Sequence, residues 1–556
     1  MTEFAPLEDV RVLDLSRGGG AAVCARLFRQ LGATVVAADP AAADARPLFE
    51  ASDLVLSDLR PFARAAAYFS QAGRAPARGH AVVSVTPYGW VGPYADRDAD
   101  AEPDLDLDGP IVRHLVGAHA AVAALGALRW ARRHRCGALV QIAAIEVLAG
   151  CLGARVPDAA CPRCGGAVST RDRADAQAAV VPCADGYLGV TASTPADRAM
   201  LAALTGLDAS GPVEMGARLT EWLRTRRRHD AFHEAQRWRL PIVPVLDPAE
   251  VLGDAQSVAR AAWTVGARGE VTARSPFRGA PGRRTRPRPA GRGITPLSDV
   301  SILDLGMVWA GPYCGRLLAG LGATVVKIEA PDRPDGTRFS GMGQCSGTFG
   351  DLNRGKASLV VDLTVPAGRD AFRRLACGAD VVLENYSPRV MPNFGLSGEA
   401  LRDHNPSLVM LSLPAFGSTG PWASYVAYGS GLELATGLAC RPPLAPPAPA
   451  SVPYLDYLAG AYGAVGVLAA LIGRDAGGGG AHVEIAQREV ACQVLETVLR
   501  GGAWRSFPCA DAAVLTAHPQ LAALGFFATA PADSAICYHY ARPPWQLQVG
   551  QIRGER

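Results

Sequence analysis

Short apolar stretches recur along this chain of 556 residues and alternate with turns and longer, helix-like segments. Each half opens with an apolar strand, a Gly-rich turn and a helix, and a second apolar strand follows. This order predicts a βαβ unit, whose two strands are parallel because the helix carries the chain back across the sheet. The strands predicted in this way are 10–15, 33–37, 53–56, 81–85, 301–305, 323–328, 380–383 and 408–413.

The two halves are copies of one segment. Residues 6–39 (PLEDVRVLDLSRGGGAAVCARLFRQLGATVVAAD) align without a gap on residues 296–329 (PLSDVSILDLGMVWAGPYCGRLLAGLGATVVKIE). The copies differ in length, because copy one lacks counterparts of PDRPDGTRFSGMGQCSGTFGDLNRGKASLVVDL and of YVAYGSGLELATGLA. Predicted core strands survive on either side of both losses, so the scaffold of copy one is expected to persist.

One position of the repeat exchanges an acid for a base. The segments GPIVRHLVGAHAAVAALGAL and SVPYLDYLAGAYGAVGVLAAL align on Gly117 and Gly460, which places Arg113 opposite Asp456. A repeat that keeps its scaffold but replaces a carboxylate by a guanidinium indicates one working half and one supporting half.

The patterns together predict an α/β fold: two Rossmann-like, doubly wound parallel-sheet units and a smaller α+β domain. In the smaller domain, DGYLGVTAS at 185–193 is predicted as a turn and strand, and EWLRTRRRHDAFHEAQRW at 221–238 as one charged helix. The predicted domains are a degenerate α/β unit at 1–150, a small domain at 151–267, an Arg-, Pro- and Gly-rich linker at 268–295, a second α/β unit at 296–492 and a truncated C-terminal segment at 493–556.

Composition narrows the classes of function. Hydrophobic residues make up 49% of the chain and charged residues 19%, as in globular proteins, and the net charge of +3 predicts neither nucleic-acid nor membrane binding. Aromatic residues are not interleaved regularly with the arginines of 268–293, so a linker is favoured there over a nucleic-acid-binding arm. The longest apolar run, 458–473, is short for a membrane span, which predicts a buried helix.

The 13 cysteines are scattered along the chain, and no apolar secretory segment follows Met1, so free thiols in a reducing cytoplasm are expected. Cys161 and Cys164 form a C-x-x-C pair, with Cys151 and Cys183 within reach in the sequence. A structural zinc ion needs four ligands, and one C-x-x-C with two stray cysteines favours unpaired thiols instead. No metal site is therefore predicted.

The opening of copy two, GMVWAGPYCGRL, superficially resembles a dinucleotide-binding turn. The spacing does not give G-x-G-x-x-G, and Trp309 and Pro312 stand where the backbone would have to approach a pyrophosphate closely. A nicotinamide cofactor is therefore disfavoured.

Several motifs of copy two, in order, carry a family resemblance. They are AGPYCGRLLAGLGATVVKIEAP, NRGKASLVVDL, ADVVLENYSPRVMPNFGL and NPSLVMLSLPAFGSTGP, followed by Asp456 ahead of a Gly/Ala-rich helix. This set resembles the class III CoA-transferases, the group of formyl-CoA transferase, carnitine CoA-transferase and α-methylacyl-CoA racemase. The resemblance is strong over 296–492 and covers 6–295 as a shortened copy. It implies a transferase that moves CoA between an acyl-CoA and a carboxylic acid, with no permanently bound cofactor.

The resemblance implies that Asp456 is the nucleophile. A carboxylate that is stripped of water beside a thioester carbonyl can attack it, form a mixed anhydride and release CoA thiolate. The alternative is that Asp456 caps the apolar helix that follows it. Arg113 cannot attack a carbonyl, so catalysis in copy one is not expected.

The resemblance also implies a set of CoA contacts. Arg338, Lys356 and Asn385 match the family pattern, Arg354 adds a charge, and the backbone of 308–310 is expected to line the pocket. The full expected set is Val308, Trp309, Ala310, Arg338, Arg354, Lys356 and Asn385. In copy one these positions are deleted or replaced, as where Asp58 stands opposite Asn385.

Some positions depart from the family pattern. Trp309 replaces a polar residue, Asn393 stands where an Arg is common, and Ala415 where formyl-CoA transferase carries a Lys, so acyl specificity is left open. The racemases use a His-Asp pair where this chain has Tyr428-Gly429, which favours a transferase, because neutral tyrosine is a weak base near pH 7. A racemase or epimerase, a lyase or acyltransferase using the same Asp, and a non-catalytic CoA-binding subunit stay open as alternatives.

The resemblance has a consequence for assembly. Members of this family form interlocked dimers, so a tandem chain is expected to form such a pair within itself, or to form a homodimer. Copy two has little room for a small domain of its own, and we expect copy one to supply it from residues 151–295.

Overall fold

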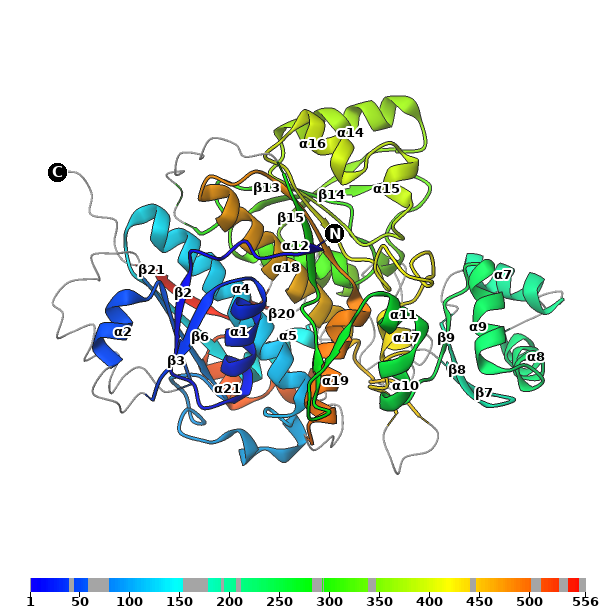
Figure 1. Cartoon of the computed structure of the whole chain (residues 1–556), viewed down its shortest axis with the longest axis horizontal. Helices are drawn as coiled ribbons and strands as arrows, with labels where there is room; N and C mark the ends of the chain where they lie inside the picture. The colour runs from blue at the N-terminus through cyan, green and yellow to red at the C-terminus, as the bar shows by residue number, and fades with distance from the viewer. Residues whose placement is uncertain are drawn as a thin grey trace.

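Two large sheets, the helices packed between and around them, and a small domain at one side make up the protein (Figure 1). The computed structural model describes residues 2–39, 45–58, 80–153, 179–191, 195–206, 212–282, 293, 295–338, 347–440, 447–501, 512–529 and 539–549.

Copy two forms most of an eight-stranded sheet in the order β1-β12-β18-β17-β16-β13-β14-β15. The six strands from β15 to β18 are parallel, and the first of them in the chain, β13, lies between β14 and β16. This is the strand order of a doubly wound, Rossmann-like sheet. The strands are β13 (Ser301–Asp304), β14 (Thr324–Glu329), β15 (Lys356–Val360), β16 (Val381–Glu384), β17 (Val409–Ser412) and β18 (Ala481–Ile485).

Copy one forms a six-stranded sheet of the same design in the order β21-β6-β5-β4-β2-β3. Its first strand, β2, again lies between its successors, β3 and β4. Among the described residues of copy one, a counterpart of β15 is missing from this sheet, as the shorter sequence of copy one predicts. The predicted α/β class is thereby confirmed. The ends of every predicted strand differ by at most one or two residues from those of an observed strand. The strands are β2 (Arg11–Asp14), β3 (Thr34–Ala37), β4 (Leu54–Ser57), β5 (Ala81–Thr86) and β6 (Ala138–Ala143).

Each sheet is completed by a strand from the other copy. The strand β12 (Phe277–Pro281) follows the small domain of copy one but pairs antiparallel with β18 of copy two, and β1 (Thr2–Glu3) pairs with β12. In return, β21 (Gln546–Val549), near the end of copy two, pairs antiparallel with β6 of copy one. Figure 1 shows β21 lying in the sheet of the first copy. The two copies therefore interlock within one chain.

Two long apolar helices, α4 and α18, pack against each other at the centre, with α1 against α4 and α12 against α18. A Cβ on Gly117 would lie 2.7 Å from the Gly20 carbonyl oxygen, and a Cβ on Gly460 would lie 2.6 Å from that of Ala310. These paired contacts show that the alignment of the two glycines in the sequence is correct. The helices are α1 (Gly19–Gln30), α4 (Pro110–His134), α12 (Ala310–Gly320) and α18 (Tyr454–Asp475).

Both central helices are long and apolar enough to cross a membrane by length and composition, but they lie inside the protein. The apolar window of α4 is 94% buried and that of α18 is 100% buried. The predicted buried helix at 458–473 is confirmed.

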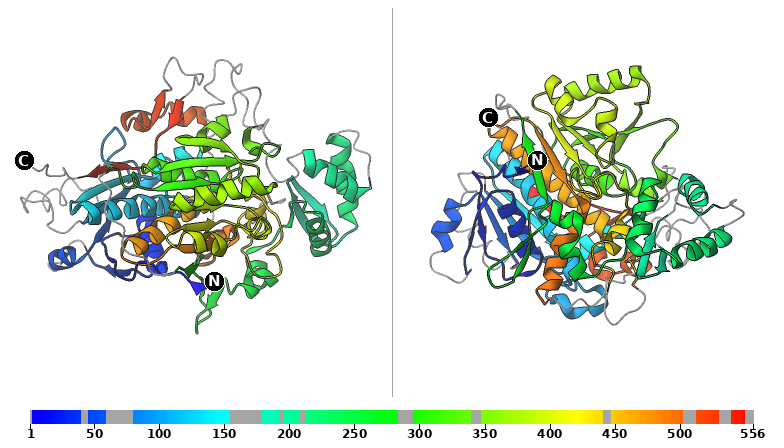
Figure 2. Two further views of the ribbon diagram at one scale, coloured as in Figure 1. Left: turned by 90° about the horizontal axis from the view of Figure 1, so that it is seen from above. Right: turned by 45° about the vertical axis from the view of Figure 1, so that its right-hand side comes forward.

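The small domain projects to one side of the molecule (Figure 2). Its antiparallel sheet has the order β7-β8-β9, and the predicted strand within 185–193 is β8. The single charged helix predicted at 221–238 is wrong: two helices form, because Asp185 and Ala184 in the β7–β8 turn bond to the backbone of Arg228 and Arg226. The elements are β7 (Ala179–Cys183), β8 (Gly186–Val190), α7 (Pro195–Thr205), α8 (Pro212–Arg224), α9 (Arg228–Arg237) and β9 (Ile242–Pro244).

A tail of short elements leads into each exchanged strand, and the tail is itself repeated. The prediction of a linker at 268–295 is wrong for 271–281, which form β11 and β12, and the predicted boundary at 493 falls inside α19. The tail of copy one is α10 (Pro248–Gly253), α11 (Ala255–Ala259), β10 (Trp263–Val265) and β11 (Val271–Ala273), and that of copy two is α20 (Ala512–Thr516), α21 (Pro519–Ala523), β19 (Phe527–Thr529) and β20 (His539–Ala541).

The remaining helices cover the outer faces of the sheets or connect strands. They are α2 (Ala45–Ala51), α5 (Ala144–Cys151), α13 (Gly347–Leu352), α14 (Pro366–Gly378), α15 (Val390–Asn393), α16 (Gly398–His404), α17 (Gly429–Leu434), α19 (Gln487–Leu499) and the 3-10 turns Ala99–Ala101, Pro103–Leu105 and Gly336–Arg338.

Candidate functional site

The candidate site lies where the strand order of copy two reverses, between the loops that follow β13 and β16. Ligands of doubly wound sheets bind outside the carboxyl ends of the strands at this point. Here Asn385, after β16, accepts a hydrogen bond from the Met307 N–H at 2.8 Å and donates one to the Met307 carbonyl at 2.8 Å. In copy one, Asp58 accepts a bond from the Arg17 N–H at 2.7 Å. In both copies, therefore, a side chain that follows the equivalent strand (β4 or β16) binds the loop after the first strand. In copy two this side chain is Asn385, and it fixes the loop at 306–310.

A buried ion pair, which sequence reasoning missed, holds the same loop from below. Lys327 donates to the Gly306 carbonyl at 2.6 Å and pairs with Asp335 at 2.9 Å, and Asp335 accepts the Val308 N–H through both oxygens at 3.2 Å. Val308 has φ 67°, a strained conformation for a β-branched residue. The scarcity of lysine in the chain was the one sequence signal for Lys327.

Aromatic side chains form a wall beside the loop. Trp309 lies edge-on to Tyr457 with ring centroids 5.5 Å apart, and Tyr457 lies edge-on to Tyr313 at 4.7 Å. The Tyr313 hydroxyl bonds to Nε2 of His119, from copy one, at 2.7 Å. The other ring nitrogen of His119 lies 2.7 Å from the Leu115 carbonyl, so it carries the proton and Tyr313 donates. Burial lowers the pKa of His119 to about 4, which keeps it neutral.

Asp456 lies in the first turn of α18 on the same helix face as Gly460, which touches the start of α12. Burial raises the pKa of Asp456 to about 7, although a hydrogen bond from the Gly429 N–H opposes the shift. A Cβ on Gly429 would lie 2.1 Å from Oδ2 of Asp456, so only glycine permits this approach. The result is a carboxyl group that is removed from water and held by one backbone donor.

The alternative role of Asp456 as a helix cap is not what the structure shows. The helix α18 begins at Tyr454 and its N-cap is Pro453, with no side-chain capping bond. A carboxylate at the third helical position caps by accepting the N–H of the N-cap residue, and proline has none. The Asp456 side chain bonds to Gly429 instead.

The small domain of copy one covers the segment that holds Asp456. Gln236 donates to the Val426 carbonyl at 2.9 Å and accepts the Val426 N–H at 2.8 Å, and the Leu246 N–H bonds to the Leu434 carbonyl at 3.0 Å. These contacts attach the small domain to 426–434, which includes α17 and Gly429. These contacts agree with the expectation that copy one supplies a small domain to the site of copy two.

The equivalent place in copy one has no such cover among the described residues. Arg113 pairs there with Asp108 through two hydrogen bonds, at 2.8 and 2.5 Å, and is partly exposed. Both residues line an open pocket of about 320 Å³ together with Asp100 and Asp106. Compared with the site of copy two, this pocket lacks the carboxylate nucleophile, a counterpart of α17 and a covering small domain among the described residues.

Two of the basic residues predicted to contact CoA have partners inside the protein. Lys356 is buried, which lowers its pKa, and its ammonium contacts Asp304 and the Pro312 carbonyl, each at 2.7 Å. Arg338 forms a two-bond ion pair with Glu329 at 2.9 and 2.6 Å. Both side chains therefore brace the loops around the site, and their contact with CoA stays a prediction.

The third predicted basic residue, Arg354, contacts the tail of copy two. Its guanidinium stacks over the Tyr540 ring at 4.6 Å and donates to the Ala541 carbonyl in the tail of copy two. Val308 and Trp309 follow Met307, which Asn385 binds at the switch point, and Ala310 stands at the first position of α12. Contact of these four residues with CoA stays a prediction.

Cys161 and Cys164, the C-x-x-C pair considered as zinc ligands, lie outside the described residues. Eight cysteines that the structure does describe, among them Cys151 and Cys183, are free thiols. In the described part of the chain, His, Cys, Asp and Glu side chains do not gather into a group that could hold a metal ion.

Comparison with known proteins agrees with the repeat. The sequence profile of CoA-transferase family III matches residues 62–292 and again 297–549. A probable CoA-transferase of Mycobacterium tuberculosis is 37% identical over 236 residues, which are 40% of this chain and 30% of that protein. Succinyl-CoA–D-citramalate CoA-transferase of Chloroflexus aurantiacus is 36% identical over 213 residues, 37% of this chain and 52% of that protein.

Two further proteins also match only part of this chain. Succinate–glutarate CoA-transferase of Agrobacterium fabrum is 37% identical over 215 residues, 36% of this chain and 53% of that protein. A crystal structure of a CaiB/BaiF family protein from Brucella suis matches 38% of this chain and 59% of its own at 32% identity, with a TM-score of 0.36. The matched part is 30% of the Mycobacterium tuberculosis protein and 52–59% of the other three proteins. Because the family profile covers both copies, and with them most of the chain, this protein belongs to CoA-transferase family III.

Proposed function

We propose that the protein is a CoA-transferase that moves CoA from an acyl-CoA to a carboxylic acid through an acyl anhydride at Asp456. The observation that carries the proposal is the state of this carboxyl group. It is buried, it has one backbone donor, and it lies on the helix face that carries Gly460, which contacts Ala310 at the start of α12. A carboxylate without its hydration shell is a stronger nucleophile than one in water.

Atoms and charges balance over three steps. The Asp456 carboxylate attacks the thioester carbonyl, the C–S bond breaks, and CoA leaves as its thiolate. The acceptor carboxylate then attacks the carbonyl carbon of Asp456 (Cγ) in the mixed anhydride. The bond from that carbon to the donor's carboxylate oxygen breaks, so that the donor acid leaves and the acceptor acid is joined to Asp456. The thiolate finally attacks the acceptor carbonyl, which yields the new acyl-CoA and regenerates the Asp456 carboxylate.

The loop of 306–310 supports the first step. The N–H groups of Ala310 and Gly311 open α12 and have no partner within the helix, because the first turn never does. Such groups, with the positive end of the helix dipole, stabilise negative charge that develops on a thioester oxygen. The strained Val308 and its bonds to Asp335 hold this end of the helix in place before substrate arrives.

The tandem chain is part of the proposal. Exchanged strands and the contact of the small domain with 426–434 support an intramolecular pseudo-dimer that carries one working site. Copy one supplies the cover, and copy two supplies the nucleophile. The free thiols of the described cysteines support a cytoplasmic location.

The relatives suggest which substrates to test first. Two carry succinyl-CoA or succinate in their names, one with D-citramalate and one with glutarate. We therefore take succinyl-CoA as the first donor and dicarboxylic acids as the first acceptors.

A racemase is the second candidate, and Tyr428 argues against it. Tyr428 stands next to Gly429 at the site, and burial raises the pKa of its phenol to about 12. A phenol with this pKa does not abstract a proton at neutral pH at a useful rate. Deuterium uptake from solvent into an acyl-CoA without exchange of CoA would favour the racemase instead.

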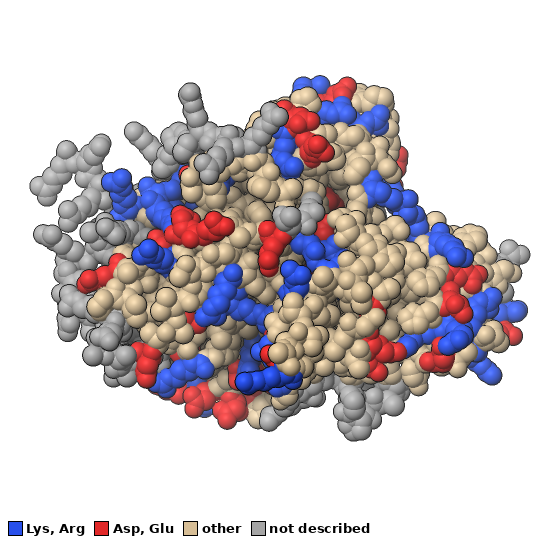
Figure 3. All heavy atoms as spheres, viewed as in Figure 1, with Lys and Arg blue, Asp and Glu red and all other residues tan. Residues whose placement is uncertain are grey.

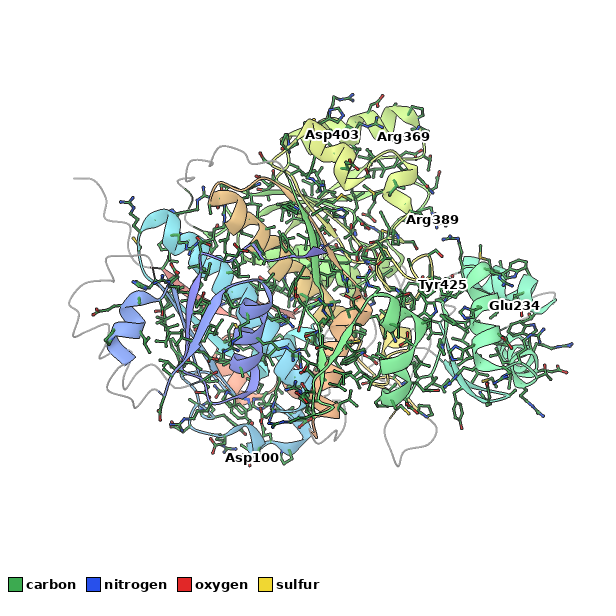
Figure 4. The ribbon with its side chains drawn as sticks, viewed as in Figure 1. Asp100, Glu234, Arg369, Arg389, Asp403 and Tyr425 are labelled. Carbon is green, nitrogen blue, oxygen red and sulfur yellow. The ribbon has the colours of Figure 1, made fainter. Side chains whose placement is uncertain are left out.

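Mass spectrometry of the intact protein tests the main proposal. Wild type incubated with a panel of acyl-CoAs is expected to gain the mass of the acyl group, and hydroxylamine is expected to convert Asp456 to a hydroxamate. Asp456→Ala should gain no mass. Asp403→Ala is the matched control, because Asp403 lies exposed on α16, far from the small domain (Figure 4). Full transferase activity of Asp456→Ala would overturn the covalent route, and CoA binding without any turnover by wild type would favour a non-catalytic subunit.

A further inference from the structure

We propose that Arg239, Arg333 and Arg389 form the site that binds the phosphates of CoA, with one arginine from copy one and two from copy two. The inference rests on the proposed function and assigns a binding site to it. Its starting point is that the basic residues expected there, Arg338 and Lys356, are already paired with Glu329 and Asp304.

The three arginines differ from those residues in having no acidic partner. Among the residues that the structure describes, none of the three guanidinium groups has a carboxylate within 4.0 Å. Arg333 and Arg389 are exposed and Arg239 is half-buried. By contrast, Arg373 in the same lobe is paired with Asp370 at 2.6 Å.

Two of the arginines follow strands that flank the switch point. Arg333 lies in the loop after β14, and Arg389 lies after β16, at the N-cap of α15. The carboxyl ends of these parallel strands meet at one edge of the sheet, where phosphates bind in doubly wound folds. The charge of Arg333 also acts on Tyr428 and Tyr386, which places it beside the candidate site.

The third arginine reaches this edge from the small domain. Arg239 follows α9 in the left-handed conformation, with φ 58°, and its N–H bonds to the Gln236 carbonyl at 3.1 Å. Gln236 is bonded to Val426, and His233 on the same helix bonds to the Tyr425 hydroxyl at 2.9 Å. These contacts fix where Arg239 lies relative to copy two.

Arg239 and Arg389 lie close enough to repel each other. Burial lowers the pKa of Arg239, and the positive charge of Arg389 lowers it further. Figure 4 shows Arg389 and Tyr425 where the lobe of α14–α16 meets the small domain, and Figure 3 shows basic side chains along this border. Like charges without a counter-charge are unfavourable unless an anion joins them, and guanidinium groups bind phosphate oxygens in pairs.

The ligand that fits is the phosphorylated nucleotide of CoA, which carries a diphosphate and a 3′-phosphate. Because copy one contributes Arg239 and copy two contributes Arg333 and Arg389, the bound phosphates would hold the small domain against the sheet of copy two. The thioester end would then extend along the loop of 306–310 toward Asp456. The phosphate end thus determines affinity, while Asp456 carries the chemistry.

Steady-state kinetics with two thioesters tests this assignment. Arg239→Ala and Arg389→Ala are each expected to raise KM for the acyl-CoA about tenfold or more, with kcat nearly unchanged, because a lost charge-assisted bond has about this effect. With the acyl-pantetheine thioester, which has no phosphates, both variants should match wild type. Arg389→Lys should recover part of the loss, and Arg374→Ala, an exposed arginine of α14 without an ion pair among the described residues, is the matched control.

A binding measurement separates this inference from the proposed function. Calorimetry with CoA, dephospho-CoA and pantetheine gives affinities without turnover, and the arginine variants should lose the preference of wild type for CoA. Loss of that preference without any acyl adduct at Asp456 would sink the proposed function and keep the phosphate site. An adduct at Asp456 with unchanged CoA affinity in Arg239→Ala and Arg389→Ala would overturn the phosphate site alone.

Discussion

Gln256 and Gln520 make the same three hydrogen bonds in the two halves of the protein. Gln256, in the tail of copy one, donates to two carbonyls and accepts one N–H in the segment 416–422 of copy two. Gln520, in the tail of copy two, does the same in the segment 88–94 of copy one. Each half therefore fastens its tail onto the other with a buried amide, and the interlocking is mutual.

Replacing either glutamine should weaken the protein by a similar amount. Gln256→Leu and Gln520→Leu each leave three backbone groups without partners in a buried place, and one such group costs about 1–3 kcal/mol. Urea denaturation should show a lower free energy of unfolding for both variants. Gln548→Leu, at an exposed position of β21, should change it by less than about 0.5 kcal/mol. Unequal losses at the two glutamines would show that the halves are not fastened alike.

The rate of transfer should rise with pH through the pKa of Asp456, which burial raises to about 7. Only the carboxylate attacks the thioester, so kcat/KM is expected to fall about tenfold for each pH unit below 7. A pH profile with succinyl-CoA as donor measures this directly. A rate that stays flat from pH 5 to pH 8 would contradict the role of Asp456 as an ionised nucleophile.

The same shift predicts how stability depends on pH. The folded-state pKa of Asp456 lies above the value of about 3.9 in an unfolded chain, so the folded protein holds a proton that the unfolded chain has released. This contribution is fully present below pH 4 and is lost as pH rises from 4 to 7. Asp456→Asn has no such loss, so its stability relative to wild type should be greater at pH 8 than at pH 4. Equal differences at the two pH values would contradict the burial of the charge.

The glycine pair on the central helices separates stability from function. Gly117→Ala and Gly460→Ala each place a Cβ within 2.7 Å of a carbonyl oxygen on the neighbouring helix, and overpacking of this kind costs about 1–3 kcal/mol. Both variants should unfold at lower denaturant concentration by comparable amounts. Only Gly460→Ala should also lower kcat, because it pushes on Ala310 at the start of α12. Equal activity losses in the two variants would contradict the division between a working and a supporting copy.

Restoring an acid in copy one should not restore a second site. Arg113→Asp recreates the carboxylate, but copy one lacks counterparts of α17 and of the loops that carry Arg333 and Lys356. Mass spectrometry of the variant with an acyl-CoA should therefore show a single acyl adduct, at Asp456. A second adduct at position 113 would show that the cover and the loops are dispensable.

Local sequence patterns were sufficient to predict the parallel sheets, because the sequence of each buried strand is a continuous run of apolar residues. The opposition of Arg113 and Asp456 was also correct, since Gly117 and Gly460 occupy equivalent contacts. Sequence reasoning failed at the tails. The strand β12 forms in a stretch rich in Arg and Pro because β18 offers it an open edge, and no local pattern announces a partner two hundred residues away.

The sequence also did not predict which carboxylates pair with the basic residues of the site. Arg338 and Lys356 were predicted as CoA ligands from their motifs, but whether a guanidinium or ammonium is available depends on the carboxylates that the fold brings to it. Glu329 and Asp304 end neighbouring strands, and their proximity to the two cations follows from strand order rather than from sequence spacing. Lys327 and Asp335 were missed for the same reason.

The exchanged strands also set the order in which the protein can be completed during synthesis. The edge of β6 becomes available after about a quarter of the chain has been made, yet its partner β21 comes from residues 546–549. Until those residues leave the ribosome, the first sheet keeps an open strand edge, which is a site for pairing with other chains. The first half of the protein is thus finished last, and a chain that stops short of β21 would leave its oldest sheet exposed.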